Sequence, residues 1–142
     1  MMPKTPVRTL WEIHSSRAPV GTDKDEAQLF FYKGAQFAAA HGPCSTDLTT
    51  TKVNELWANF CHQLPTATPF DAAMTKQIRE SQGCAWAFKT AAISIMVMTT
   101  ELSAQASSPY SLSRGLIKLR RLVDTEVNAF IQAAATDTDT VH

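Results

Sequence analysis

Four basic residues near the end of the chain are the strongest candidates for a binding site. They are Arg114, Lys118, Arg120 and Arg121, with no acidic residue between them. In a helix, Arg114, Lys118 and Arg121 share one face because they are spaced by four and three residues. Such a face can contact the phosphates of a nucleic acid or an acidic partner protein, whereas the most frequent role of a charged helix face is solvation.

The residues that follow this basic stretch weaken its positive field. Asp124 and Glu126 come directly after it and can pair with the cations locally. No aromatic residue is interleaved with the four cations. The sequence therefore does not indicate base stacking on this face.

One group of residues has the side-chain types of a metal site. It consists of His41, Cys44, Cys61 and His62. A tetrahedral zinc site needs three or four ligands that converge. His41 and Cys44 flank a tight turn, and Cys61 and His62 point about 100° apart if they lie in a helix. We therefore predict buried cysteines and surface histidines, with no metal and no cofactor.

No pattern of catalytic residues is present in the sequence. There is no nucleophile-elbow pattern, no P-loop and no Gly-x-Gly fingerprint. Nothing places a histidine beside a cysteine thiol, and the acidic residues gather at expected helix starts, where they stabilise the helix dipole. We predict that the protein is not an enzyme and has no catalytic residues.

The first 22 residues are rich in proline but too apolar for a free tail. Val7, Leu10, Trp11 and Ile13 give this arm an apolar side, so we expect it to dock on the body of the protein or on a partner. Trp11 is the candidate partner-binding residue, because aromatic anchors concentrate binding energy. The other tryptophans, Trp57 and Trp86, belong to predicted core faces.

The rest of the chain is patterned for helices. Apolar residues recur at steps of three and four, and the residues suited to helix starts are Asp23, Thr49 or Thr50, Thr68, and Ser108 or Ser111. The predicted helices are 24–40, 50–64, 68–105 with a break at 81–83, and 109–135. The segment 84–98 is apolar on nearly all sides, which is typical of a helix at the centre of a core.

These patterns predict an all-α protein, a helical bundle of four to six helices with a central apolar helix. Residues 1–22 form the docked arm, 23–135 form the bundle, and 136–142 are predicted to be a disordered tail. The chain has 142 residues, which is ordinary for one domain.

The composition of the chain limits its possible partners and its cellular location. The chain has 13 basic and 13 acidic residues, and this zero net charge argues weakly against a general polyanion binder. Three cysteines without a CxxC pair indicate a reduced protein with no disulfide. With neither a secretory signal nor an apolar run long enough to span a bilayer, we expect a cytoplasmic location and no membrane partner.

One short segment resembles a known family. Leu48-Thr49-Thr50-Thr51-Lys52-Val53 opens a predicted helix and is similar to the start of a helix in the small helical subunits of type III CRISPR effector complexes. The resemblance covers about six residues, and Asn54 stands where that family usually has a basic residue. It implies an all-α subunit without catalytic residues that packs inside a ribonucleoprotein.

Together these features predict a non-enzymatic interaction or structural subunit. It would act through contacts with a protein partner or a second copy, alone or within an RNA or DNA assembly that the basic helix contacts. Two alternatives fit the same features. One is a helical bundle that holds an apolar small molecule around Trp86, Phe88 and Met96. The other is a viral or phage protein that blocks a host factor.

Overall fold

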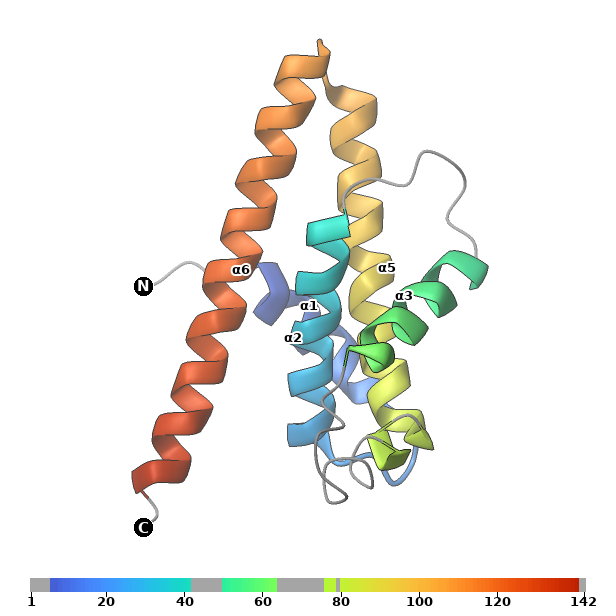
Figure 1. Ribbon diagram of the computed structural model, residues 1–142, viewed down its shortest axis with the longest axis vertical. Coiled ribbons are helices and arrows are strands. Elements are labelled where there is room, and N and C mark those ends of the chain that lie inside the picture. Colours follow the sequence, from blue (N-terminus) through green and yellow to red (C-terminus); the bar gives the residue numbers. More distant parts are fainter. Residues whose placement is uncertain (1–5, 42–49, 64–75, 79, 141–142) are drawn as a thin grey trace.

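The computed structural model describes residues 6–41, 50–63, 76–78 and 80–140 (Figure 1). Its elements are α1 (Pro6–His14), the short 3-10 helix η1 (Ser15–Arg17), α2 (Lys24–His41), α3 (Thr50–His62), α5 (Gln82–Gln105) and α6 (Pro109–Thr140). No strand occurs in these described ranges. The predicted all-α helical bundle is confirmed.

Local side-chain caps explain where three helices begin. Asp23 accepts hydrogen bonds from the backbone N–H groups of Asp25 at 3.0 Å and Glu26 at 3.2 Å, at the start of α2. Ser81 accepts from Cys84 N–H at 3.2 Å and begins α5 at the predicted break. Ser108 accepts from Ser111 N–H at 3.1 Å and begins α6. The starts at Asp23 and Ser108 were predicted from the sequence; at Ser81 only a break was predicted, and its role as a cap is a finding of the structure.

Helices α2 and α5 form the centre of the bundle and pack closely. Small residues line the contact from both sides: Gly34, Ala35 and Ala38 on α2, and Cys84, Ala87, Ala91 and Ala92 on α5. At Gly34 the two backbones come so near that an added Cβ would lie 2.8 Å from the Phe88 Cα. The predicted apolar segment 84–98 is therefore central, and α2 shares that position.

An aromatic cluster fills the space between α2, α3 and α5. The Phe88 side chain is fully buried at its centre. Its ring centroid lies 5.9 Å from that of Phe37, 5.2 Å from Trp57 and 4.8 Å from Phe60. Rings at such distances add to the stabilisation from apolar burial. The cluster therefore fastens α3 to the α2–α5 pair.

Helix α6 divides into two parts. Its C-terminal part packs on α2, where the Tyr32 and Phe130 rings stack with centroids 4.3 Å apart and Gln36 Nε2 donates to Asp124 Oδ1 at 3.3 Å. Its N-terminal part forms a hairpin with α5 that extends past the end of α2 (Figure 1). The predicted apolar face of α6 follows this division: Val123 and Val127 are fully buried, whereas Leu112 is half-buried.

Some boundaries and faces differ from the predictions. Helix α6 continues to Thr140, so most of the segment predicted to be a disordered tail is helical; the alanines at 133–135 propagate a helix that has already formed. Ile93 and Val97 on α5 are 44% and 41% exposed, because no described helix covers that side. The predicted helix start at residue 68 lies outside the described residues.

The described helices do not include a membrane span. None of them combines the length and the apolar character needed to cross a bilayer.

Candidate interaction surface

Three of the four predicted basic residues lie together on one exposed face of α6. Arg114, Lys118 and Arg121 line a shallow groove of about 480 Å³ together with Gly115 and Ile117. Their spacing over two helical turns explains why they gather there, as predicted. In the described part of the chain, no carboxylate lies within ion-pair distance of these three cations. The groove is therefore a positively charged surface with an apolar residue among its cations.

Arg120 lies elsewhere. It lines a separate cavity of about 370 Å³ between α2, the end of α3 and α6, which Lys33 also lines. Arg120 Nε is 3.9 Å from Asp124 Oδ2, and the two side chains are 57% and 38% exposed. This is a weak, solvated pair. Arg120 is thus not part of the groove.

The two acidic residues that follow the basic stretch bind groups other than the three groove cations. Asp124 contacts Arg120 and also accepts the hydrogen bond from Gln36 on α2. Glu126 accepts hydrogen bonds from the backbone N–H groups of Val7 at 3.1 Å and Arg8 at 2.8 Å, at the start of α1. Among the ion pairs in the described part of α6, the expected local pairing is seen for Arg120 with Asp124, and neither acid pairs directly with Arg114, Lys118 or Arg121.

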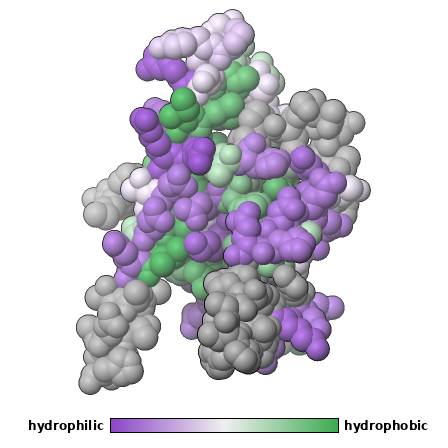
Figure 2. All heavy atoms as spheres, viewed as in Figure 1, coloured by the Kyte–Doolittle hydropathy of each residue, from purple (hydrophilic) through white to green (hydrophobic). Residues whose placement is uncertain are grey.

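Apolar side chains accompany the cations on the hairpin. Ile117 is 49% exposed and Leu122 is 45% exposed. Tyr110 is 71% exposed, and the Arg114 guanidinium lies over its ring, 5.8 Å from the centroid. Figure 2 shows apolar surface on the outer part of the hairpin, bordered by hydrophilic surface along α6. Our sequence analysis missed Tyr110, although its spacing of four residues from Arg114 places both on one face.

The predicted anchor Trp11 lies against the protein's own core. Its ring centroid is 5.3 Å from that of Phe31 and 6.5 Å from that of Trp86, both in edge-on geometry. The side chain is half-buried, and Val7 of the same helix is fully buried. The arm is thus docked on the body through α1. A partner-binding role for Trp11 stays a prediction and involves only the exposed part of the ring.

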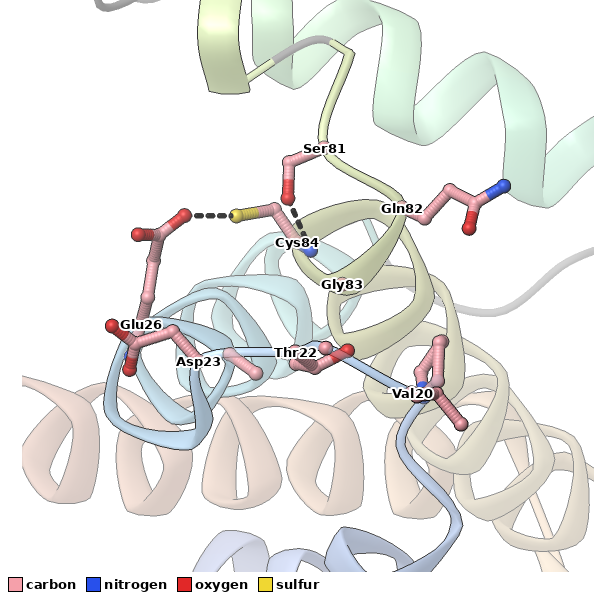
Figure 3. A pocket seen from close by; sticks show the side chains of 11 residues that line it. Val20, Thr22, Asp23, Glu26, Ser81, Gln82, Gly83 and Cys84 are labelled. Carbon is pink, nitrogen blue, oxygen red and sulfur yellow. Dashed lines mark hydrogen bonds between the residues drawn. The ribbon is translucent and has the colours of Figure 1, made fainter.

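A second cavity, of about 320 Å³, lies where α2 and α5 begin (Figure 3). Within it the Cys84 thiol donates a hydrogen bond to Glu26 Oε1 at 2.9 Å. Burial first, and then the hydrogen bond to Glu26, raises the pKa of the Cys84 thiol from 9.0 to about 12. A thiol that keeps its proton at neutral pH is a poor nucleophile. At neutral pH the Cys84 thiol is therefore a hydrogen-bond donor to Glu26 and not a thiolate.

The predicted ligand types at the ends of α2 and α3 are not brought together. His41 and His62 are exposed and Cys61 is buried, while Cys44 lies outside the described residues. Within the described ranges, no three histidine, cysteine, aspartate or glutamate side chains are arranged to hold a metal ion.

The region considered for an apolar ligand is tightly packed. Phe88 and Met96 are 0% and 1% exposed, and the cavities described above are lined by other residues. Trp86 is half-buried and faces Trp11. The structure therefore offers no specific observation in favour of a small apolar ligand at these three residues.

The α6 groove is the described feature with the clearest binding chemistry. It offers three cations and an exposed aliphatic side chain on one helix, and these groups can bind and orient a partner. Comparisons of this chain with protein-family models, with curated proteins and with solved structures find no match.

Proposed function

We propose that this protein is a non-enzymatic interaction subunit that uses the exposed face of α6 to hold an acidic partner. The supporting observation is the groove lined by Arg114, Ile117, Lys118 and Arg121 on a hairpin that extends past the body. Because Asp124 contacts Arg120 and Gln36 and Glu126 caps α1, neither acid pairs directly with the three cations, whose charge is available to a partner.

One observation favours a second candidate function, membership of a nucleoprotein assembly. The exposed Tyr110 ring lies at one end of the cationic face, with Arg114 over it. An exposed ring beside a line of cations can stack on an unpaired base while the cations contact phosphates. This candidate agrees with what the resemblance of residues 48–53 to a ribonucleoprotein subunit implies.

A binding experiment tests the proposed function. The wild type is titrated with labelled poly-glutamate, single-stranded RNA and single-stranded DNA at low and moderate salt. The same titrations use Arg114→Glu/Lys118→Glu/Arg121→Glu and a matched control, Arg17→Glu/Lys24→Glu/Lys76→Glu. The control reverses three exposed cations elsewhere, so both variants have the same net charge.

We expect salt-sensitive binding of poly-glutamate that falls about tenfold or more in the α6 variant and much less in the control. If single-stranded RNA binds more tightly, the logarithm of its affinity should fall with the logarithm of salt with a slope of about −2 for three contacts, which favours the nucleoprotein candidate. Absence of binding to every polyanion at low salt, or equal losses in both variants, contradicts the proposed function.

A further inference from the structure

The groove on α6 has a composition that suits one class of acidic partner. Arg114, Lys118 and Arg121 surround Ile117, whose side chain is 49% exposed. In sequence these residues stand at i, i+3, i+4 and i+7, so the aliphatic side chain lies among the cations on one helical face. A partner that satisfies this face needs carboxylates together with an apolar side chain between them.

We propose that the groove takes an acidic amphipathic helix of a partner protein, with one apolar anchor on Ile117 and carboxylates on Arg114, Lys118 and Arg121. This inference rests on the proposed function and names the partner. A helix presents anchors at i, i+3, i+4 and i+7, which is the spacing of the residues on α6. Charged groups around a small apolar centre fix the orientation of such a helix and raise its association rate.

The same surface suits a nucleic acid less well. A sugar–phosphate backbone gains nothing from an aliphatic side chain set among the cations, and base stacking needs rings. On this face Tyr110 is the one ring in the described part of α6, and it lies at the end of the face rather than along it. Ile117 is therefore the residue that distinguishes the two kinds of partner.

A second copy of the chain suits the surface less well too. A two-fold axis through the groove would bring the three cations of one copy against the same three cations of the other. Like charges facing each other across an interface are destabilising. The occupant must carry the opposite charge, which is why we assign the groove to an acidic helix.

The experiment uses two synthetic helical peptides of equal charge. The first carries glutamates on both sides of a leucine stripe, and the second has serine in place of each leucine. Binding of each is measured by fluorescence anisotropy to the wild type, to Ile117→Gln and to a matched control, Ile93→Gln. Ile93 is 44% exposed on α5, so the control loses an equally exposed apolar side chain outside the groove.

We expect the leucine peptide to bind the wild type at least about tenfold more tightly than the serine peptide. Ile117→Gln should weaken the leucine peptide about fivefold to tenfold, a clearly larger loss than it causes in the binding of poly-glutamate. Ile93→Gln should change neither. Because Ile117 is half-exposed, its replacement by glutamine should preserve the helicity and Tm, which circular dichroism checks.

The outcomes that overturn the inference differ from those that overturn the proposed function. Equal binding of the two peptides is compatible with the proposed function but contradicts the proposal that the partner is an amphipathic helix. Tighter binding of single-stranded RNA that Ile117→Gln does not change assigns the face to a nucleic acid. Self-association of the wild type that Ile117→Gln abolishes, measured by sedimentation, assigns it to a second copy. Failure of every polyanion to bind removes both proposals.

Discussion

The contact of α2 with α5 and the hairpin of α5 with α6 are both pairs of helices, yet they pack differently. Along α2, small residues let the α5 backbone approach until Gly34 meets Phe88 directly. In the hairpin, the glycine of α6 faces a side chain: a Cβ on Gly115 would lie 3.6 Å from Leu102 Cδ2, which is ordinary van der Waals contact. The spacing of α2 and α5 is therefore set by backbone atoms in direct contact, whereas the spacing of α5 and α6 at Gly115 is set by a side chain that can change its conformation.

This difference suggests that the α2–α5 region stabilises the fold and that the α5–α6 hairpin is available for binding. The α2–α5 pair and the aromatic rings around Phe88 bury most of the large side chains. On the hairpin, Ile117 and Leu122 are 49% and 45% exposed. A partner can therefore use the hairpin without opening the core.

Gly34→Ala should be the most damaging of these changes. The new Cβ would lie 2.8 Å from the Phe88 Cα and 2.9 Å from its carbonyl carbon, and backbone atoms in two helices cannot move independently. The helices must separate, so we expect the free energy of unfolding to fall by about 3 kcal/mol. Urea denaturation followed by circular dichroism measures this. An unchanged denaturation midpoint would mean that the two backbones are not held as closely as described.

Because of the Cys84 thiol, we expect the free energy of unfolding to decrease at alkaline pH. Burial and the hydrogen bond to Glu26 raise its pKa in the folded protein from 9.0 to about 12. Above pH 9 the unfolded chain therefore loses this proton while the folded protein keeps it. The contribution of the protonated Cys84 thiol to the free energy of unfolding is complete below pH 9 and is lost as the pH rises towards 12.

Cys84→Ser isolates this contribution, because serine can donate to Glu26 but does not titrate in this range. Tyrosines and lysines titrate in both proteins and cancel in the comparison. We expect the difference in urea midpoint between the wild type and Cys84→Ser to shift against the wild type from pH 8 to pH 11. Curves that stay parallel over this range would contradict the raised pKa.

Glu126→Gln should have a moderate effect, because it acts on the docked arm. The Glu126 carboxylate accepts from the first N–H groups of α1 and faces the positive end of that helix dipole. Glutamine keeps one acceptor but loses the charge, so we expect a loss of about 1 kcal/mol. Urea denaturation followed by tryptophan fluorescence measures this loss. Glu12→Gln, at a solvated pair with Arg8, is the control and should be nearly neutral.

The helices could be predicted from the sequence because their signals are local. The cap residues Asp23, Ser81 and Ser108 each bond to a backbone N–H two or three residues away. Their side chains and their partners are therefore neighbours in the sequence. The common face of Arg114, Lys118 and Arg121 follows from spacing in the same way.

The features that define the candidate surface depend on distant parts of the chain. Glu126 reaches α1 across 119 residues of sequence, so nothing near it shows that it will cap a helix instead of pairing locally. Tyr32 is buried because α6 stacks Phe130 on it. The exposure of Ile117 depends on where α2 ends relative to the hairpin. The spacing of apolar residues predicts which face of a helix is apolar, but it does not predict where a neighbouring helix ends and therefore which part of that face it covers.

Gly115→Ala should change stability least and in the opposite direction from Gly34→Ala. Alanine lowers the free energy of a helix relative to glycine, and the new Cβ would meet Leu102 Cδ2 at an ordinary 3.6 Å. We expect a gain of about 0.5–1 kcal/mol and a rise of about 2 °C in Tm, measured by thermal denaturation. A loss of stability would mean that the hairpin is held as closely as the core, and the division between a rigid core and an accommodating binding surface would then be wrong.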